Sequence, residues 1–501
     1  MSDNTVLPRS PGRHLLEGSA WMIGLRWAIR LTGLVSTVIL ARLLVPADFG
    51  IVAMAMLVVG MLELLSQSGQ KLAIIRHQNP GRDDYDTAWT VSVLVGMLIA
   101  GAILVVAPFT PAYFHEPRAV PVMQCLALRA AMGGFENIGI VDFRRELRFD
   151  RFFLYNMGPK LASVVVTISL AFLWRNYWAL VAGILSGQFA MVATSYAMHA
   201  YRPRFSLARL REIYAFSGWT LFRTAGLYFN SKADEFAVGG VLGAGAMGRY
   251  SVGADFAASP LEEINAPMVA VLYPVMSRLQ NDGVRLRELY LRTLAWSGLI
   301  CASVSVGITL IAHDFTILVL GPKWLAVEPL IGWLALSAGL LGLSSGAYAI
   351  FDVIGKPHLG ARMQWTRLIM LVVVLAPVAW LMRDLQAIAI VRFVVTGLFV
   401  PTLFVAVSYH IGVSSKEYWE ALWRPSASAA VMALLIFVVN RQIDPGNFRL
   451  AADIVLGATF FTAALLCLWF LGGRPATSPE GDVMALCLRF FKCRALPQRP
   501  V

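Results

Sequence analysis

The sequence predicts an all-α polytopic membrane protein with about fourteen transmembrane helices. Of its 501 residues, 58% are hydrophobic and 14% are charged, whereas soluble domains carry about 25% charged residues. Long apolar runs recur from Trp21 to Leu471, and a helix needs roughly 20 apolar residues to cross a bilayer. Together these observations exclude a disordered chain and a soluble enzyme with a tail anchor.

Polar and proline-containing breaks separate the apolar runs and define the predicted spans. The first run is too long for a cleavable signal sequence and leads into further spans, so a polar tail over residues 1–18 is expected to precede it. In order, the spans lie near residues 20–44, 50–70, 88–108, 119–140, 153–174, 177–200, 213–239, 248–275, 290–312, 326–354, 362–382, 385–409, 420–440 and 450–472.

Lysine and arginine divide unevenly between alternate loops. Starting with the N-terminal tail, alternate segments hold 26 basic residues, the other segments hold 8, and 8 more lie within spans. Because cytoplasmic loops carry the basic excess in membrane proteins, both termini are expected in the cytoplasm. The same excess explains the net charge of +12 without a nucleic-acid partner. Asp83, Asp84 and Asp86, beside Arg82, are interpreted as a solvated loop on this side.

The cysteines indicate no metal or redox chemistry. They form no CxxC motif and no spacing with histidine, so they are expected to be inert thiols, and neither a metal nor another cofactor is expected. The five are Cys125, Cys301, Cys467, Cys487 and Cys493.

A weak internal repeat recurs at an offset of 198 residues. Ser19-Ala20-Trp21 matches Ser217-Gly218-Trp219, and Leu44 and Gly50 match Leu242 and Gly248. The repeat predicts two six-helix lobes, an arrangement in which transporters hold substrate in a central cavity at the lobe interface. The predicted parts are an N-tail (1–18), an N-lobe (19–212), a C-lobe (213–412), two additional spans (413–473) and a cytoplasmic C-tail (474–501).

Four motifs in order along the chain carry a resemblance to a known family. The segment 41–50, Ala-Arg-Leu-Leu-Val-Pro-Ala-Asp-Phe-Gly, follows the first span, and 143–149, Phe-Arg-Arg-Glu-Leu-Arg-Phe, precedes the fifth. Val-Leu-Gly at 241–243 with Gly-Arg-Tyr at 248–250, and Tyr-Pro-Val-Met-Ser-Arg-Leu-Gln at 273–280, complete the set. From about Gly18 to Leu471 the chain resembles polysaccharide flippases of the multidrug/oligosaccharidyl-lipid/polysaccharide exporter superfamily.

The resemblance implies a function as well as a fold. Similar proteins have two six-helix lobes around a cavity, and alternating access moves undecaprenyl-diphosphate-linked oligosaccharide repeat units from the cytoplasmic to the periplasmic leaflet. This implies a non-enzymatic bacterial inner-membrane protein for exopolysaccharide, capsule or O-antigen synthesis. Its implied partners are the lipid-linked oligosaccharide, membrane lipids, a polysaccharide polymerase and a chain-length regulator.

Arginines inside the spans indicate an anionic substrate independently. An arginine at the bilayer centre costs roughly 2.5–3.5 kcal/mol on insertion scales, so such residues usually face a watery cavity. Arg26 and Arg30 lie one helical turn apart and could grip a diphosphate through paired bonds to its oxygens. Arg223 lies one position from the repeat equivalent of Arg26, and Arg129 lies deep in the fourth span. The alternatives are snorkelling for Arg26 and an acid partner for Arg129. Interfacial or snorkelling roles are expected for Arg42, Lys160, Arg367 and Arg392.

Acidic residues in the spans are candidates for proton or ion coupling, because burial raises a carboxyl pKa and lets access change its protonation. The candidates are Glu63, Asp255 and the pair Glu262 and Glu263, which lies beside Pro260 and Pro267 in the eighth span. The alternative for all four is a structural partnership with the arginines.

Two other functions remain open on the sequence alone. A membrane glycosyltransferase or polymerase would need a sizeable outer loop with catalytic acids or histidines, whereas the predicted outer loops are short. A drug/cation antiporter of the same superfamily would favour a mainly acidic cavity, whereas several buried charges here are arginines.

Overall fold

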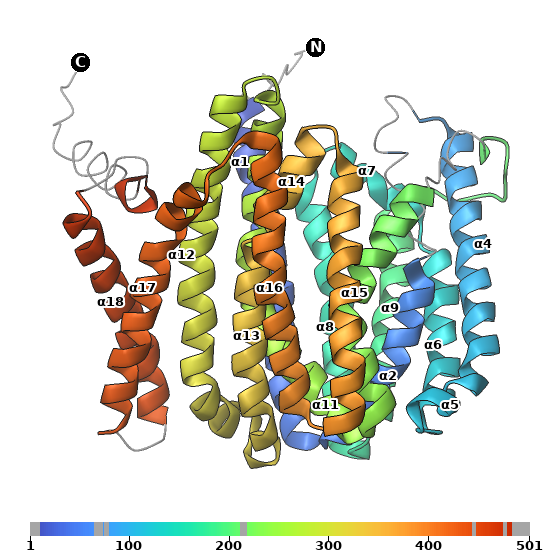
Figure 1. The fold of residues 1–501 in the computed structure, drawn as a ribbon. Helices are drawn as coiled ribbons and strands as arrows, with labels where there is room; N and C mark the ends of the chain where they lie inside the picture. The colour runs from blue at the N-terminus through green and yellow to red at the C-terminus, as the bar shows by residue number, and fades with distance from the viewer. Residues whose placement is uncertain are drawn as a thin grey trace, which may run out of the picture. The chain divides into compact units, whose positions relative to one another are not determined.

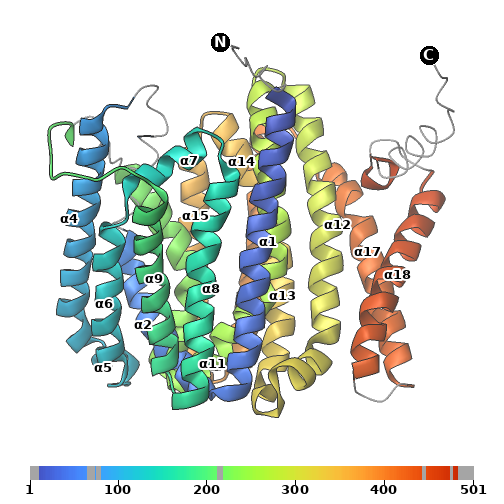
Figure 2. The same cartoon turned by 180° about the vertical axis from the view of Figure 1, so that it is seen from behind.

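A computed structural model describes residues 11–64, 74, 80–210, 218–442, 447–473 and 478–482. Within these ranges the secondary structure is entirely helical, and the chain divides into an N-terminal unit (residues 1–248) and a C-terminal unit (residues 249–501). Figures 1 and 2 show the long helices of each unit running side by side. The tail predictions for residues 1–10, for most of 474–501 and for Cys487 and Cys493 lie outside the described residues.

The N-terminal unit is a bundle of helices in which α1 packs on α8, α8 on α9, and α4 on α6. The first half of α11, which continues past the unit's last residue, also belongs to it. The bounds are α1 (Pro11–Leu43), α2 (Pro46–Glu63), α4 (Arg82–Val106), η2 (Ala107–Phe109), α5 (Pro111–Phe114), α6 (Ala119–Gly134), η3 (Ile138–Ile140), α7 (Val141–Arg145), α8 (Phe149–Trp174), α9 (Trp178–Met198) and α11 (Gly218–Arg278).

The C-terminal unit is organised around α12, which packs against α13, α17 and α18, while α16 packs on α13 and α15. The second half of α11 belongs to this unit. The bounds are α12 (Gly283–Phe315), η4 (Thr316–Leu320), η5 (Pro322–Val327), α13 (Glu328–Gly342), α14 (Ser345–Val353), α15 (Pro357–Met382), α16 (Leu385–Ile411), α17 (Ser415–Asn440) and α18 (Asn447–Leu471).

Within the described residues, a helix lies in each of the fourteen predicted spans. Eleven segments of the described chain are long and apolar enough to cross a membrane. The three other predicted spans are 119–140, which is the 16-residue α6, and 213–239 and 248–275, which are both parts of α11. Gly243, with φ of 79°, interrupts α11 between those two spans. The polytopic helical fold is therefore confirmed, while the count of fourteen crossings stays a prediction.

Apolar side chains also cover outward-facing helix surfaces, as a lipid environment requires. On α15, Val373, Trp380 and Leu381 are 65%, 67% and 71% exposed. Contiguous exposed apolar surface of this kind marks a membrane or protein interface. Because the helix is also long enough to span the bilayer, lipid is its natural neighbour.

The acidic cluster at the start of α4 differs from its predicted role as a solvated loop. Asp84 accepts a hydrogen bond of 2.7 Å from the Gly81 N–H and so caps α4. Asp86 is 4% exposed and accepts hydrogen bonds from the Tyr201 hydroxyl and, at 2.8 Å, from the Arg204 N–H. Burial, together with the bond to Asp86, raises the pKa of Tyr201. The cluster therefore ties the segment after α9 to α4.

The repeat-related glycines meet in the N-terminal unit. A Cβ on Gly50 would lie 1.7 Å from the carbonyl oxygen of Ala244, and a Cβ on Gly248 would lie 1.8 Å from that of Pro46. Position 244 is the repeat equivalent of 46, as 248 is of 50, so the two contacts are equivalent under the 198-residue offset. Each glycine therefore leaves room for a neighbouring backbone, and a larger residue at either position would clash with it.

Candidate substrate-binding site

Helix α1 carries two guanidinium groups on one face. Arg26 is exposed and Arg30 is half-buried, and both lie in the stretch Gly24–Leu43 that is apolar enough to span a membrane. Their separation of four residues places them one above the other. Two planar guanidinium groups at this spacing suit a ligand with several phosphate oxygens, because each guanidinium can donate two parallel hydrogen bonds.

Helix α8 adds a third cation to this face of α1. A Cβ on Gly33 would lie 3.7 Å from the Lys160 Nζ, so the glycine leaves room for the ammonium group against α1. The positive charge of Arg30 acts on Lys160, which places the two cations near each other. Lys160 lies near the middle of α8 rather than at an interfacial end. The N-terminal unit thus gathers Arg26, Arg30 and Lys160, which we call the cationic cluster.

Sequence reasoning expected Lys160 at the interface and did not place it with Arg30. The sequence did carry one signal against an interfacial location, because residue 160 falls well inside the predicted span 153–174. Contact between α1 and α8 could not be read from that position, since it depends on tertiary packing.

Glu63 and Arg129 form an ion pair between α2 and α6. Arg129 Nη1 lies 2.6 Å from Glu63 Oε1, and each side chain is 27% exposed. The acid partner considered for Arg129 is therefore present, and it is one of the predicted coupling residues. The contact ties the end of α2 to α6.

A second group of polar side chains lies on the first half of α11. The Tyr228 hydroxyl donates to the Leu57 carbonyl of α2 at 2.5 Å, and the charge of Glu63 acts on this tyrosine. Glu235, 6% exposed, accepts a bond of 2.6 Å from Lys232, and its neighbour Asp234 is fully buried. Sequence reasoning missed these two acids, although charged residues in the apolar stretch 213–239 were a visible signal.

The remaining predicted residues fall elsewhere on α11. Arg223 is half-buried in the part of α11 that belongs to the N-terminal unit. Asp255 and Glu262 are exposed and Glu263 is half-buried in the part that belongs to the C-terminal unit. Helical geometry is interrupted at Gly243, not at Pro260 or Pro267. The structure thus brings Glu63 to Arg129 within the N-terminal unit and places Asp255, Glu262 and Glu263 in the other unit.

The described residues contain no group of three or more histidine, cysteine, aspartate or glutamate side chains that could hold a metal ion. The charged groups described above in the N-terminal unit are guanidinium, ammonium and carboxylate groups, which can bind a charged molecule through ion pairs and hydrogen bonds.

Comparison with known proteins gives concordant matches. The model of a family described as polysaccharide biosynthesis protein matches residues 39–329. A succinoglycan biosynthesis transport protein of Rhizobium meliloti is 23% identical over 447 residues, covering 86% of this chain and 88% of the relative. A lipopolysaccharide biosynthesis protein of Escherichia coli is 23% identical over 330 residues, covering 65% and 67%. The solved structure of the lipid II flippase MurJ in an inward closed conformation is similar in fold, with a TM-score of 0.69, 12% identity, and coverage of 89% and 98%.

Proposed function

The chain belongs to the polysaccharide biosynthesis protein family, and from this we propose that it is a flippase for lipid-linked oligosaccharides. Its substrate is an undecaprenyl-diphosphate-linked repeat unit, which moves by alternating access from the cytoplasmic to the periplasmic leaflet. The product serves exopolysaccharide, capsule or O-antigen synthesis. Relatives named for polysaccharide transport support this function, and the cationic cluster inside spanning helices is the observation that carries the substrate class.

The cationic cluster is the proposed diphosphate site. A diphosphate needs several donors and positive charge, and Arg26 and Arg30 supply paired bonds while Lys160 supplies a point charge. Placing three cations inside apolar helices is costly unless they face water or an anion. Arg223 and Arg129 are proposed as further contacts. Arg129 would bind the substrate by exchanging its bond to Glu63 for a bond to the diphosphate.

Coupling of transport to a proton or ion is proposed for Glu63, Asp255, Glu262 and Glu263. Glu63 has the clearest physical route, because a substrate that competes for Arg129 would break the ion pair and release the carboxylate. The other three lie on α11, whose break at Gly243 offers a place for bending between inward and outward states.

The environment follows from the function. We place the protein in the bacterial inner membrane with both termini in the cytoplasm, as the loop charges indicate. A polysaccharide polymerase and a chain-length regulator are its proposed working partners, because a translocated repeat unit must be polymerised on the far side.

Reconstitution in liposomes tests the proposal directly. Translocation of a labelled undecaprenyl-diphosphate oligosaccharide is compared among the native chain, Arg26→Ala with Arg30→Ala, Lys160→Ala, Arg223→Ala and the matched control Lys416→Ala, whose side chain is 84% exposed. Loss of translocation in the cluster variants, with native thermal stability and a normal control, supports the site. Translocation unchanged in the cluster variants rejects the site but keeps the flippase. Absence of translocation by the native chain across several glycans rejects the function.

A further inference from the structure

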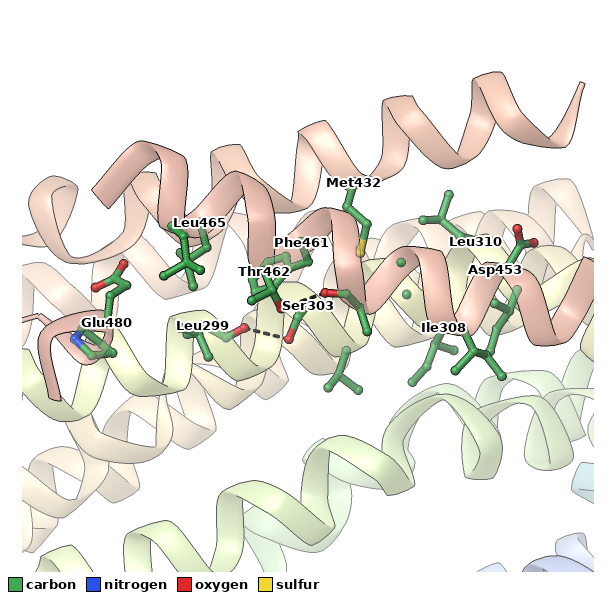
Figure 3. A pocket seen from close by; sticks show the side chains of 18 of the residues that line it. Leu299, Ser303, Ile308, Leu310, Met432, Asp453, Phe461, Thr462, Leu465 and Glu480 are labelled. Atoms are coloured by element: carbon green, nitrogen blue, oxygen red, sulfur yellow. Dashed lines mark hydrogen bonds between the residues drawn. The ribbon is translucent and has the colours of Figure 1, made fainter. Parts of the chain in front are cut away.

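The C-terminal unit contains a long apolar pocket between α12, α17 and α18. Its volume is about 670 Å³, and its walls include Leu299, Ile308, Leu310, Met432, Phe461 and Leu465. Ile454 and Leu466 also line it and are 55% and 36% exposed, so the pocket opens on the outer side of α18. Figure 3 shows Asp453 at one end of the pocket and Glu480 at the other.

The length of the pocket suits one lipid chain. From Asp453 to Leu466 along α18, a rise of ~1.5 Å per residue gives about 20 Å. The hydrocarbon of one bilayer leaflet is about half of the full ~30 Å core. The apolar wall is therefore at least as long as the hydrocarbon of one leaflet is thick, and an acyl chain anchored near Asp453 fits along it.

Asp453 is a buried lining residue, and one of its carboxylate oxygens has no hydrogen-bond partner among the described residues. Asp453 is 3% exposed, and its Oδ2 accepts a hydrogen bond of 3.0 Å from the Asn440 side-chain amide. Its Oδ1 is buried and has no hydrogen-bond partner among the residues that the structure describes. A buried acceptor without a donor costs about 1–3 kcal/mol, more when it is charged, so a ligand that donates to this oxygen would be stabilised.

The charges at the two ends of the pocket differ. Near Asp453, Asp314 is already bound by Arg449 through an Nε–Oδ2 contact of 2.6 Å, so two carboxylates share one guanidinium. At the other end, Glu480 Oε2 is also buried without a hydrogen-bond partner among the described residues, but Arg424 Nη1 lies 3.7 Å from it. Arg292 binds Asp482, so each acid at this end has an arginine of its own nearby. The Asp453 end therefore attracts a cation, and the nearby Arg449 suits an adjoining phosphate.

We propose that this pocket binds a membrane phospholipid with an ethanolamine head group, with the ammonium donating to Asp453 Oδ1 and one acyl chain filling the pocket. The ammonium carries N–H donors, which the trimethylammonium of a choline lipid lacks. An anionic glycerol head group offers no cation for Asp453. The site lies apart from the cationic cluster and holds a resident lipid rather than the transported substrate.

Native mass spectrometry of the purified full chain tests the proposal without a transport assay. The protein is titrated with ethanolamine, choline and glycerol phospholipids that have identical acyl chains. We expect about tenfold preference for the ethanolamine lipid over the choline lipid, as one charge-assisted hydrogen bond gives, and loss of that preference in Asp453→Asn. Equal retention of the two lipids, or a preference for the glycerol lipid, overturns the proposal.

If Asp453→Asn does not fold, a second variant that fills the pocket still tests the proposal. Gly307 lines the pocket, and a Cβ there would meet no atom within 4 Å among the described residues, so Gly307→Leu fills the space without moving the backbone. Gly101→Leu on α4, where a Cβ also meets nothing within 4 Å, is the matched control. Loss of ethanolamine-lipid binding in Gly307→Leu but not in Gly101→Leu supports the site, and equal binding by both variants overturns it.

Discussion

The two units use charge inside their helices in different ways. In the N-terminal unit, two cationic side chains, Arg30 and Lys160, lie near each other in the interior of spanning helices. In the C-terminal unit, arginines pair with acids near helix ends, as Arg287 does with Glu417 and Arg449 with Asp314. A pair at a helix end stabilises the fold, whereas like charges within apolar helices cost stability unless water or an anion faces them. The contrast supports the proposal that substrate binds in the N-terminal unit, while the paired charges of the C-terminal unit stabilise its fold.

The largest effect is expected from removing one partner of a buried pair in the C-terminal unit. Asp314 has a side chain only 2% exposed and is held by Arg449. Arg449→Leu leaves that carboxylate without its guanidinium and should cost about 3 kcal/mol of stability, the lower end for a broken buried pair. Thermal unfolding in detergent measures this loss.

The control for that experiment is Arg285→Leu. Its pair with Asp282 has side chains 72% and 45% exposed, so the loss should be below about 0.5 kcal/mol. Translocation per folded molecule should stay at the native rate in both variants. A tenfold loss of translocation by stably folded Arg449→Leu would show that the paired charges of the C-terminal unit also take part in transport, contrary to the proposed difference between the units.

The next largest effect is expected from the cationic cluster. Lys160→Met removes a charge from the middle of α8 beside Arg30, so stability should stay equal or rise while translocation falls by about tenfold, equivalent to one lost charge-assisted contact of ~1.4 kcal/mol. Lys160→Arg keeps the charge and should retain most of the rate. Proteoliposome assays with thermal unfolding of the same samples separate the two effects. A destabilised Lys160→Met would mean that this lysine is structural, like the charges of the C-terminal unit.

The sequence predicted where the helices lie better than which of them touch. Fourteen apolar runs all became helices because their length and composition require it. The repeat match picked out Gly50 and Gly248 but did not predict that each packs against a neighbouring backbone. Pairings such as Lys160 with α1, or Asp86 with Tyr201, could not be predicted because they depend on which helices pack together. Asp453 was missed for the same reason, since its environment is created by α12 and α17.

The Glu63 and Arg129 pair sharpens the comparison, because it is an ion pair inside the unit that also holds the cationic cluster. A double-mutant cycle with Glu63→Gln and Arg129→Gln should give a coupling free energy of about 1 kcal/mol in stability, as expected for a partly exposed pair. We also expect Glu63→Gln to flatten the dependence of translocation on a pH gradient. If the rate of Glu63→Gln keeps the native dependence, the pair belongs with the structural pairs and coupling must lie at Asp255, Glu262 or Glu263.

The smallest effect is expected where the charges lie outside the spans. Arg118 donates to Glu116 through Nε at 2.8 Å, and these bonds lower the pKa of the Glu116 carboxyl. Because the folded pKa lies below the ordinary value of about 4.3, the pair's contribution is present above that value and is lost as the pH falls through the folded pKa. Arg118 is mostly exposed, so Arg118→Gln should cost less than about 0.5 kcal/mol at pH 7. Thermal unfolding of native and variant protein should differ slightly at pH 7 and coincide at low pH. If the difference in thermal stability persists unchanged at low pH, Arg118 stabilises the fold by packing rather than by its charge. This surface pair could then not be used as a baseline for the effect of charges inside the membrane.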